Sequence, residues 1–133
     1  MTYLLDANAV SVLVRNPQGK VAERLAEVGE RNVMTSVVVR AEIEFGVRKK
    51  GSVELARKVG NIMRRLYVAP LAPPADDYYA AVRLDLERKG QLIGPNDLFI
   101  AAHALALDAT LVTDNEREFS RVSGLKVENW LRL

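Results

Sequence analysis

The chain has 133 residues, of which 49% are hydrophobic and 27% are charged, and its net charge is +2. This is an ordinary globular balance, and the length favours one domain spanning residues 1–133. The sequence has no cysteine and one histidine, which excludes disulfides, cysteine-ligated zinc and chemistry that needs two imidazoles. No apolar run is long enough to cross a membrane and no signal-peptide pattern opens the chain, so we expect a cytoplasmic protein.

Short apolar runs alternate with amphipathic segments along the chain. Strands are predicted at residues 2–5, 33–35, 67–69, 109–113 and 125–127. Helices are predicted at residues 7–14, 20–28, 52–66, 75–89 and 95–107. Residues 37–50 are ambiguous, because three consecutive valines favour a strand while the later apolar spacing fits a helix capped by Ser36. The alternation predicts a parallel sheet covered by helices, with the working site beyond the carboxyl ends of the strands.

The most informative residue is Asp97, which opens the apolar run at residues 98–107 directly after Gly94-Pro95-Asn96. A carboxylate in the first turn of a largely buried helix lies at the edge of the core, where it faces a site. The alternative is a charge that stabilises the helix dipole, a contribution of about 0.3–1 kcal/mol. His103, later in this helix, is expected to be a partly buried histidine with satisfied hydrogen bonds and not a metal ligand.

Two acids in the first third of the chain have similar settings. Asp6 follows the first predicted strand, and an N-cap of the helix beginning at Ala7 is an equally good interpretation of it. Glu42 lies within residues 37–50, where a solvated helix residue is the alternative. We expect Glu42 and not Glu44 to face the site, because Glu42 shares a helical face with Phe45 and the helix must turn its apolar side inward.

A fourth acid, Asp114, follows the predicted strand at residues 109–113. Its alternative role is a cap of the short helix that ends near Phe119. Thr113 can support a site by hydrogen bonding to a carboxylate or a water. Asn8 can orient a carboxylate or a water in the same way, or serve only as a turn residue.

Several carboxylates in one place cannot all remain ionised without a counter-charge, because like charges raise one another's pKa. A divalent cation supplies that charge, and a site made only of oxygen ligands suits Mg²⁺, for which Mn²⁺ can substitute. A bound metal lowers the pKa of a coordinated water and stabilises charge on a departing oxygen. The acids therefore predict a metal-dependent nuclease.

The chain resembles the PIN-domain ribonucleases, in particular the VapC-type toxins of type II toxin–antitoxin pairs. The resemblance is carried by residues 4–8, 35–46, 93–104, 111–119 and 121–130. It implies a PIN-like three-layer α/β/α sandwich with a mostly parallel sheet. It also implies that Asp6, Glu42 and Asp97 bind the metal and act in catalysis. Many PIN domains place a fourth acid two residues after the threonine, where this chain has Asn115, so Asp114 and Asn115 both remain candidates for the fourth position.

The resemblance further implies Mg²⁺-dependent endonucleolytic cleavage of RNA, often a structured tRNA. It implies a homodimer and inhibition by a co-expressed antitoxin. Basic residues fit an RNA substrate, since phosphate contacts position nucleic acid, although a solvated helical face explains them equally well. The candidate RNA-binding residues are Arg40, Arg48, Lys49 and Lys50.

Two other functions compete with a nuclease. A phosphoacceptor signalling domain also gathers acids at strand ends, but it needs a lysine beyond a late strand, and Lys126 lies inside the last predicted strand. A catalytically silent PIN-like scaffold would bind only nucleic acid or a partner. The acids at all three main positions argue against that scaffold.

Overall fold

The structure, a computed structural model, describes residues 1–132. Within these residues five strands form one sheet: β1 (Tyr3–Leu5), β2 (Val33–Ser36), β3 (Tyr67–Ala69), β4 (Thr110–Val112) and β5 (Val127–Glu128). The strand order is β3-β2-β1-β4-β5, and every neighbouring pair is parallel. The chain extends the sheet from β1 to one side and later to the other. The carboxyl end of β1 is therefore the switch point, where parallel α/β sheets bind their ligands.

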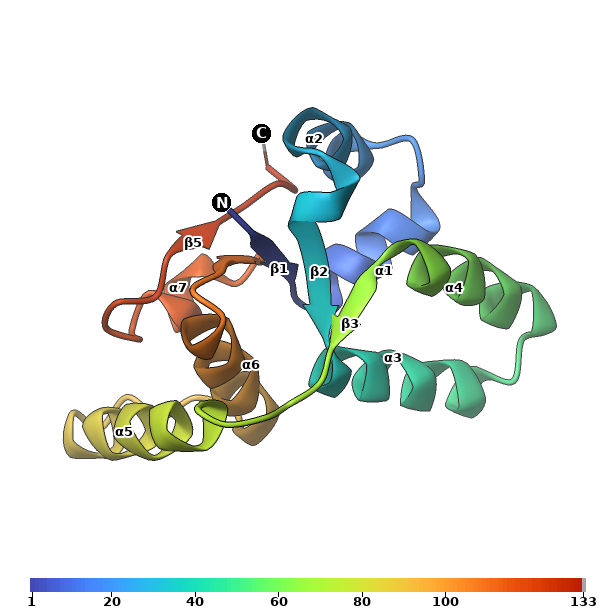
Figure 1. Ribbon diagram of the computed structural model, residues 1–133. Helices are drawn as coiled ribbons and strands as arrows, with labels where there is room; N and C mark the ends of the chain where they lie inside the picture. The colour runs from blue at the N-terminus through green and yellow to red at the C-terminus, as the bar shows by residue number, and fades with distance from the viewer. Residues whose placement is uncertain (133) are drawn as a thin grey trace.

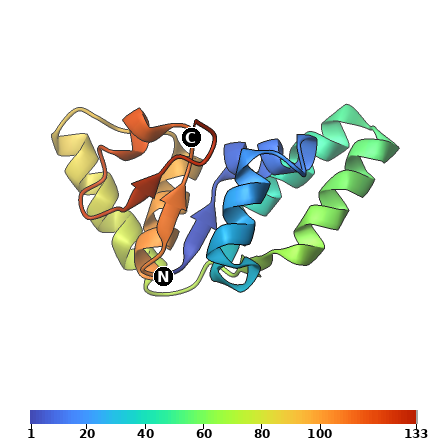
Figure 2. The same ribbon diagram turned by 90° about the horizontal axis from the view of Figure 1, so that it is seen from above.

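Helices flank this sheet on two sides (Figure 1). Figure 2 shows α1 to α4 on one side of the strands and α5 and α6 on the other. Helices α3 and α4 form a hairpin that projects away from the sheet (Figure 1). This arrangement confirms the predicted α/β sandwich with a parallel sheet. The helix bounds are α1 (Ala7–Arg15), α2 (Lys20–Val28), α3 (Val37–Lys50), α4 (Val53–Arg65), α5 (Ala75–Arg88), α6 (Pro95–Ala106) and α7 (Glu116–Phe119), with a 3-10 turn at Glu30–Asn32.

The ambiguous segment at residues 37–50 is helical, and the cause is its two ends. The hydroxyl of Ser36 accepts a hydrogen bond from the backbone N–H of Val38 at 3.0 Å, which caps the first turn. Gly51 closes the helix in the left-handed conformation, with φ of 68°. Capping at both ends outweighs the strand preference of the three valines. The other predicted elements agree with the structure to within one or two residues at each end.

The core surrounds the two central strands. All residues of β1 and β4 are buried, so both strands are covered on both faces, as continuous apolar runs in parallel sheets require. The backbone N–H of Asp6 donates to the carbonyl of Val112 at 3.0 Å, which continues the β1–β4 pairing one residue beyond the strand. Asp6 is thereby fixed at the switch point. Across residues 1–132 no helix has both the length and the apolar character of a membrane span.

Candidate active site

Asp6 is held by the first turn of α1. Its Oδ1 accepts a hydrogen bond from the backbone N–H of Ala9 at 2.9 Å, and its side chain is only 3% exposed. Burial raises the pKa of Asp6 from 3.8 to about 6. Hydrogen bonds from Thr113 and from the backbone lower this pKa, and the charge of Glu42 raises it further. Asp6 is thus a helix cap and also a buried acid whose pKa responds to the charge of Glu42.

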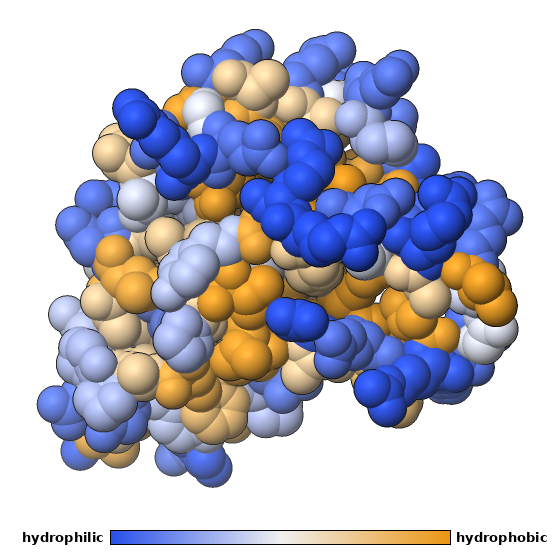
Figure 3. Space-filling model, turned by 45° about the vertical axis from the view of Figure 1, so that its right-hand side comes forward, coloured by the Kyte–Doolittle hydropathy of each residue, from blue (hydrophilic) through white to orange (hydrophobic). Residues whose placement is uncertain are grey.

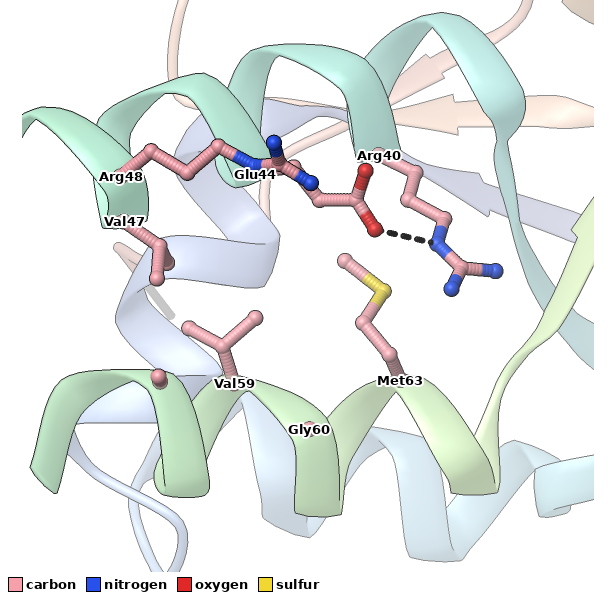
Figure 4. Close-up of a pocket in the computed structure, with 8 residues that line it drawn as sticks. Arg40, Glu44, Val47, Arg48, Val59, Gly60 and Met63 are labelled. Atoms are coloured by element: carbon pink, nitrogen blue, oxygen red, sulfur yellow. Dashed lines mark hydrogen bonds and ion pairs between the residues drawn. The ribbon is translucent and has the colours of Figure 1, made fainter. Parts of the chain in front are cut away.

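Glu42 and Glu44 lie on different faces of α3: Glu42 has a buried carboxylate oxygen, while Glu44 faces the pocket between α3 and α4 (Figure 4). Glu44 is exposed and forms an ion pair with Arg40 at 3.0 Å. In contrast, Oε1 of Glu42 is buried and has no hydrogen-bond partner among the described residues. The reason given for choosing Glu42 was wrong, however, because Phe45 is 67% exposed and does not mark the buried face. A buried carboxylate oxygen without a partner is expected to interact with a group that the chain itself does not supply.

Asp97 lies in the first turn of α6, behind Pro95, and is partly buried. Its pKa is raised from 3.8 to about 7. Burial is the largest cause, followed by the charge of Glu118, a hydrogen bond to Glu118, and the charges of Glu42 and Asp6. The charges of Glu42 and Asp6 act on Asp97, and the charge of Glu42 acts on Asp6, so the three predicted acids lie near one another. That these acids form the functional site stays a prediction.

Glu118 is the member of the cluster that sequence reasoning missed. Its Oε1 accepts a weak hydrogen bond at 3.4 Å from the backbone N–H of Gly94, the residue that precedes α6. Its other oxygen accepts from the side-chain amide of Asn115. The only sequence signal was its neighbour Phe119, a buried side chain that fixes the short helix α7 against the core. Asn115 serves the cluster by holding Glu118 and not as an acid.

Asp114 lies apart from the cluster's charges. Its Oδ1 accepts hydrogen bonds from Nε of Arg132 at 2.8 Å and from Nδ2 of Asn129 at 3.0 Å. These bonds, that of Asn129 first, lower the pKa of Asp114. Asp114 is also not the cap of α7, whose N-cap residue is Asn115. The structure therefore couples Glu118 to Asp97 and ties Asp114 to the C-terminal segment.

The other predicted site residues have varied positions. Thr113 contacts Asp6 as expected, while the side chain of Asn8 is exposed. Arg40 and Arg48 line a pocket of about 240 Å³ between α3 and α4, on a floor that includes Val59 (Figure 4). Glu42 does not line this pocket.

Lys50 is the predicted RNA-binding residue that shares a cavity with one of the acids, Glu42. Glu42 and Lys50 lie on the wall of a cavity of about 450 Å³, which continues over aliphatic side chains of α1, α3 and α4. Lys49 instead lies over the ring of Phe45, 5.9 Å from its centre. Figure 3 shows apolar side chains gathered in the hollow of the α3–α4 hairpin, with hydrophilic side chains around them.

The cluster has the chemistry of a site for a hard cation. All four members offer carboxylate oxygens, two have raised pKa values, and Glu42 carries a buried oxygen with no partner. As placed, no three acidic or histidine side chains within residues 1–132 form a closed metal-ligand group. The carboxylate oxygens are of the type that hard divalent cations prefer.

Comparison with known proteins settles the family. The family model of the PIN domain matches residues 3–125. The chain belongs to the PIN-domain family. This PIN domain is 36% identical to Ribonuclease VapC2 of Rickettsia felis over 98% of each chain. It is 30% identical to the tRNA(fMet)-specific endonuclease VapC of Shigella flexneri, again over 98% of each chain.

Solved structures agree with this assignment. The toxin–antitoxin pair VapBC2 of Rickettsia felis, bound to a DNA fragment from its promoter, contains a chain that superposes with a TM-score of 0.89. That chain is 36% identical, and the match covers 98% of this PIN domain and 99% of the other chain. DNA-bound VapBC of Salmonella typhimurium gives a TM-score of 0.88 at 29% identity, with 98% of each chain covered. The PIN domain is therefore of the VapC type.

Proposed function

We propose that this VapC-type PIN domain is a Mg²⁺-dependent endoribonuclease and the toxin of a type II toxin–antitoxin pair. One observation supports this most strongly: acids from four separate elements act on one another near the carboxyl end of β1, Asp6 and Asp97 have raised pKa values, and Glu42 has an orphaned carboxylate oxygen. The ribonuclease names of its relatives agree with it.

The proposed ligands of the cation are Asp6, Glu42, Asp97 and Glu118. We propose Glu118 in place of Asp114, because the carboxylate of Asp114 is already bonded to Arg132. Bound Mg²⁺ would neutralise these carboxylates and would supply the Lewis acidity that activates water for phosphodiester hydrolysis.

Asp97 and Asp6 both affect how a cation would bind at this site. With a pKa of about 7, Asp97 carries a proton for part of the time at neutral pH. That proton must leave when a cation binds, so metal affinity should rise with pH through this range. Asp6 cannot turn away to escape the other acids, because the N–H of Ala9 holds its Oδ1.

We propose RNA as the substrate, with a structured tRNA as the first candidate because the Shigella flexneri relative is named for one. Lys50 is the best placed cation for a phosphate beside the scissile bond, since it shares a cavity wall with Glu42. Such a substrate agrees with a cytoplasmic location, which we also propose.

Two surfaces fit the proposed protein partners. The aliphatic cavity of α1, α3 and α4, lined by Ile43, Leu55 and Val59 among others, suits an apolar segment of an antitoxin that ends at the acids. An exposed stripe on α3 suits a homodimer, because Val37 is 41% and Phe45 67% exposed and Ala41 lies between them at helical spacing. The stripe and the cavity share α3, so both partners would lie close to Glu42.

Neither competing function gains support from the structure. A phosphoacceptor domain needs a lysine at its acids, but the ammonium group of Lys126 lies 3.7 Å from Asp108 and is exposed. The PIN-domain assignment replaces that interpretation. A silent scaffold has no need of buried acids with raised pKa values, which cost stability.

The test compares Asp97→Ala with Asp76→Ala. Both are aspartates in the first turn of a helix, but Asp76 is exposed on α5. We expect wild type and Asp76→Ala to cleave tRNA in Mg²⁺ and to stop in EDTA, and Asp97→Ala to show no cleavage while keeping its fold by circular dichroism. The same pattern is expected for growth arrest on expression in a bacterium. Equal cleavage by Asp97→Ala and wild type would remove the basis of the proposal.

A further inference from the structure

A buried polar contact joins the two helices that carry Glu42 and Asp97. Nδ1 of His103 on α6 lies 2.7 Å from Oγ of Ser36, the residue that caps α3. His103 is 1% exposed and Ser36 is fully buried. Buried polar contacts between elements far apart in sequence restrict how those elements shift against each other.

The hydroxyl of Ser36 has a part in two hydrogen bonds. It accepts from the backbone N–H of Val38 at 3.0 Å, so its own proton is free to donate to Nδ1 of His103. Burial lowers the pKa of His103, which keeps the ring neutral and able to accept a hydrogen bond. The Pro70 carbonyl has a smaller effect in the opposite direction. Nε2 of the ring is buried and has no hydrogen-bond partner within residues 1–132. Ser36 therefore holds the ring at Nδ1, and the Pro70 carbonyl is a second polar group beside the ring.

The Ser36–His103 contact can affect the relative positions of Glu42 and Asp97. Ser36, the N-cap of α3, precedes Glu42 by six positions, and His103 follows Asp97 by six positions on α6. Six residues span roughly 9 Å along a helix. Because each acid lies this far from the Ser36–His103 contact, a small tilt of either helix about the contact moves its acid by a sizeable fraction of an ångström. Errors of about 1 Å impair metal and catalytic sites.

We propose that the Ser36–His103 hydrogen bond is a positioning device that sets the spacing of Glu42 and Asp97 for the divalent cation. His103 is a positioning residue and not a ligand, because Ser36 occupies its Nδ1 and its ring is buried. This inference rests on the proposed function, since it assumes that the acids bind a cation.

The test measures Mn²⁺ binding to the EDTA-treated full chain by titration calorimetry. Ser36→Ala and His103→Leu remove the contact and should each weaken Mn²⁺ binding by about 10-fold, as loss of supporting hydrogen bonds does in other metal sites. His103→Asn keeps a polar atom near the Nδ1 position and should restore most of the affinity. Ser52→Ala is the matched control, because Ser52 also caps a helix, α4, by accepting from the N–H of Leu55 at 3.1 Å, but it has no part in the Ser36–His103 contact.

A second readout separates positioning from general destabilisation. When RNA cleavage is followed against Mg²⁺ concentration, Ser36→Ala and His103→Leu should need more Mg²⁺ but approach the wild-type maximal rate, because the acids are intact. Wild-type Mn²⁺ affinity in both variants, or an equal loss in Ser52→Ala, would overturn the inference. Absence of Mn²⁺ binding by the wild type would instead refute the proposed function itself, and the Asp97→Ala variant sets that baseline.

Discussion

The burial of Asp6 predicts that ionisation of this side chain lowers the unfolding free energy of the metal-free protein. The pKa of Asp6 is about 6 in the folded chain, against an ordinary value of 3.8. This difference corresponds to about 3 kcal/mol of unfolding free energy that is present below pH 3.8 and absent above pH 6. The sign follows from the raised pKa: between these values the folded state binds more protons than the unfolded state, so stability falls as pH rises. Asp6→Asn removes the ionisation, and an asparagine oxygen can still accept from the N–H of Ala9.

We therefore expect Asp6→Asn to be more stable than the wild type by about 3 kcal/mol at pH 7.5 without metal, and by much less at pH 4. Urea unfolding of the EDTA-treated proteins at the two pH values measures this difference. Adding Mg²⁺ at pH 7.5 should stabilise the wild type and leave Asp6→Asn unchanged, since the cation replaces the missing counter-charge. A pH-independent difference between the two proteins, or a less stable Asp6→Asn at pH 7.5, would refute the reasoning.

Two further substitutions test the fourth acid and the homodimer. Glu118→Gln should lower the pKa of Asp97, because the charge of Glu118 raises it, and should raise the Mg²⁺ concentration for half-maximal RNA cleavage by about 10-fold. Glu116→Gln, on the same helix but bonded to Asn129, should behave as the wild type, and a similar effect of both changes would point to α7 itself. Phe45→Lys should convert the dimer to a monomer in light scattering after size-exclusion chromatography, because it places a charge on the exposed α3 stripe. Val53→Lys, at an 86% exposed position on α4, should remain dimeric, and a dimeric Phe45→Lys would place the interface elsewhere.

Much of the fold could be predicted because local signals agreed with one another. The helix predicted at residues 20–28 forms at those residues, where apolar spacing and Gly29 point to the same bounds. The last strand was predicted two residues too early at its start. It pairs only Val127 and Glu128, so backbone pairing with β4 defines it more than apolar character does.

The site was predictable where acids follow strands or open helices, and less so elsewhere. Glu42 carries the buried, unpartnered oxygen, but the reason for preferring it to Glu44 was wrong, because the exposed Phe45 belongs to the surface stripe and not to the core. The hairpin of α3 and α4 leaves apolar residues outward, which periodicity alone cannot distinguish from the buried face. Sequence periodicity gives the angle between two side chains on a helix but not which direction is inside.

The proposed exchange of Asp114 for Glu118 rests on a property that separates the two acids. Asp114 lies two residues and Glu118 six residues after the end of β4, and only Asp114 of these two acids was a candidate from the sequence. Asp114 has a cation partner, Arg132, that comes from 18 residues further along the chain, and its pKa is lowered. The acids of the cluster form no ion pair with any arginine or lysine within residues 1–132, and the pKa values of Asp6 and Asp97 are raised. A fold that pairs one carboxylate and leaves neighbouring carboxylates unpaired and partly buried keeps the second kind for a ligand, because only an incoming positive charge removes the cost.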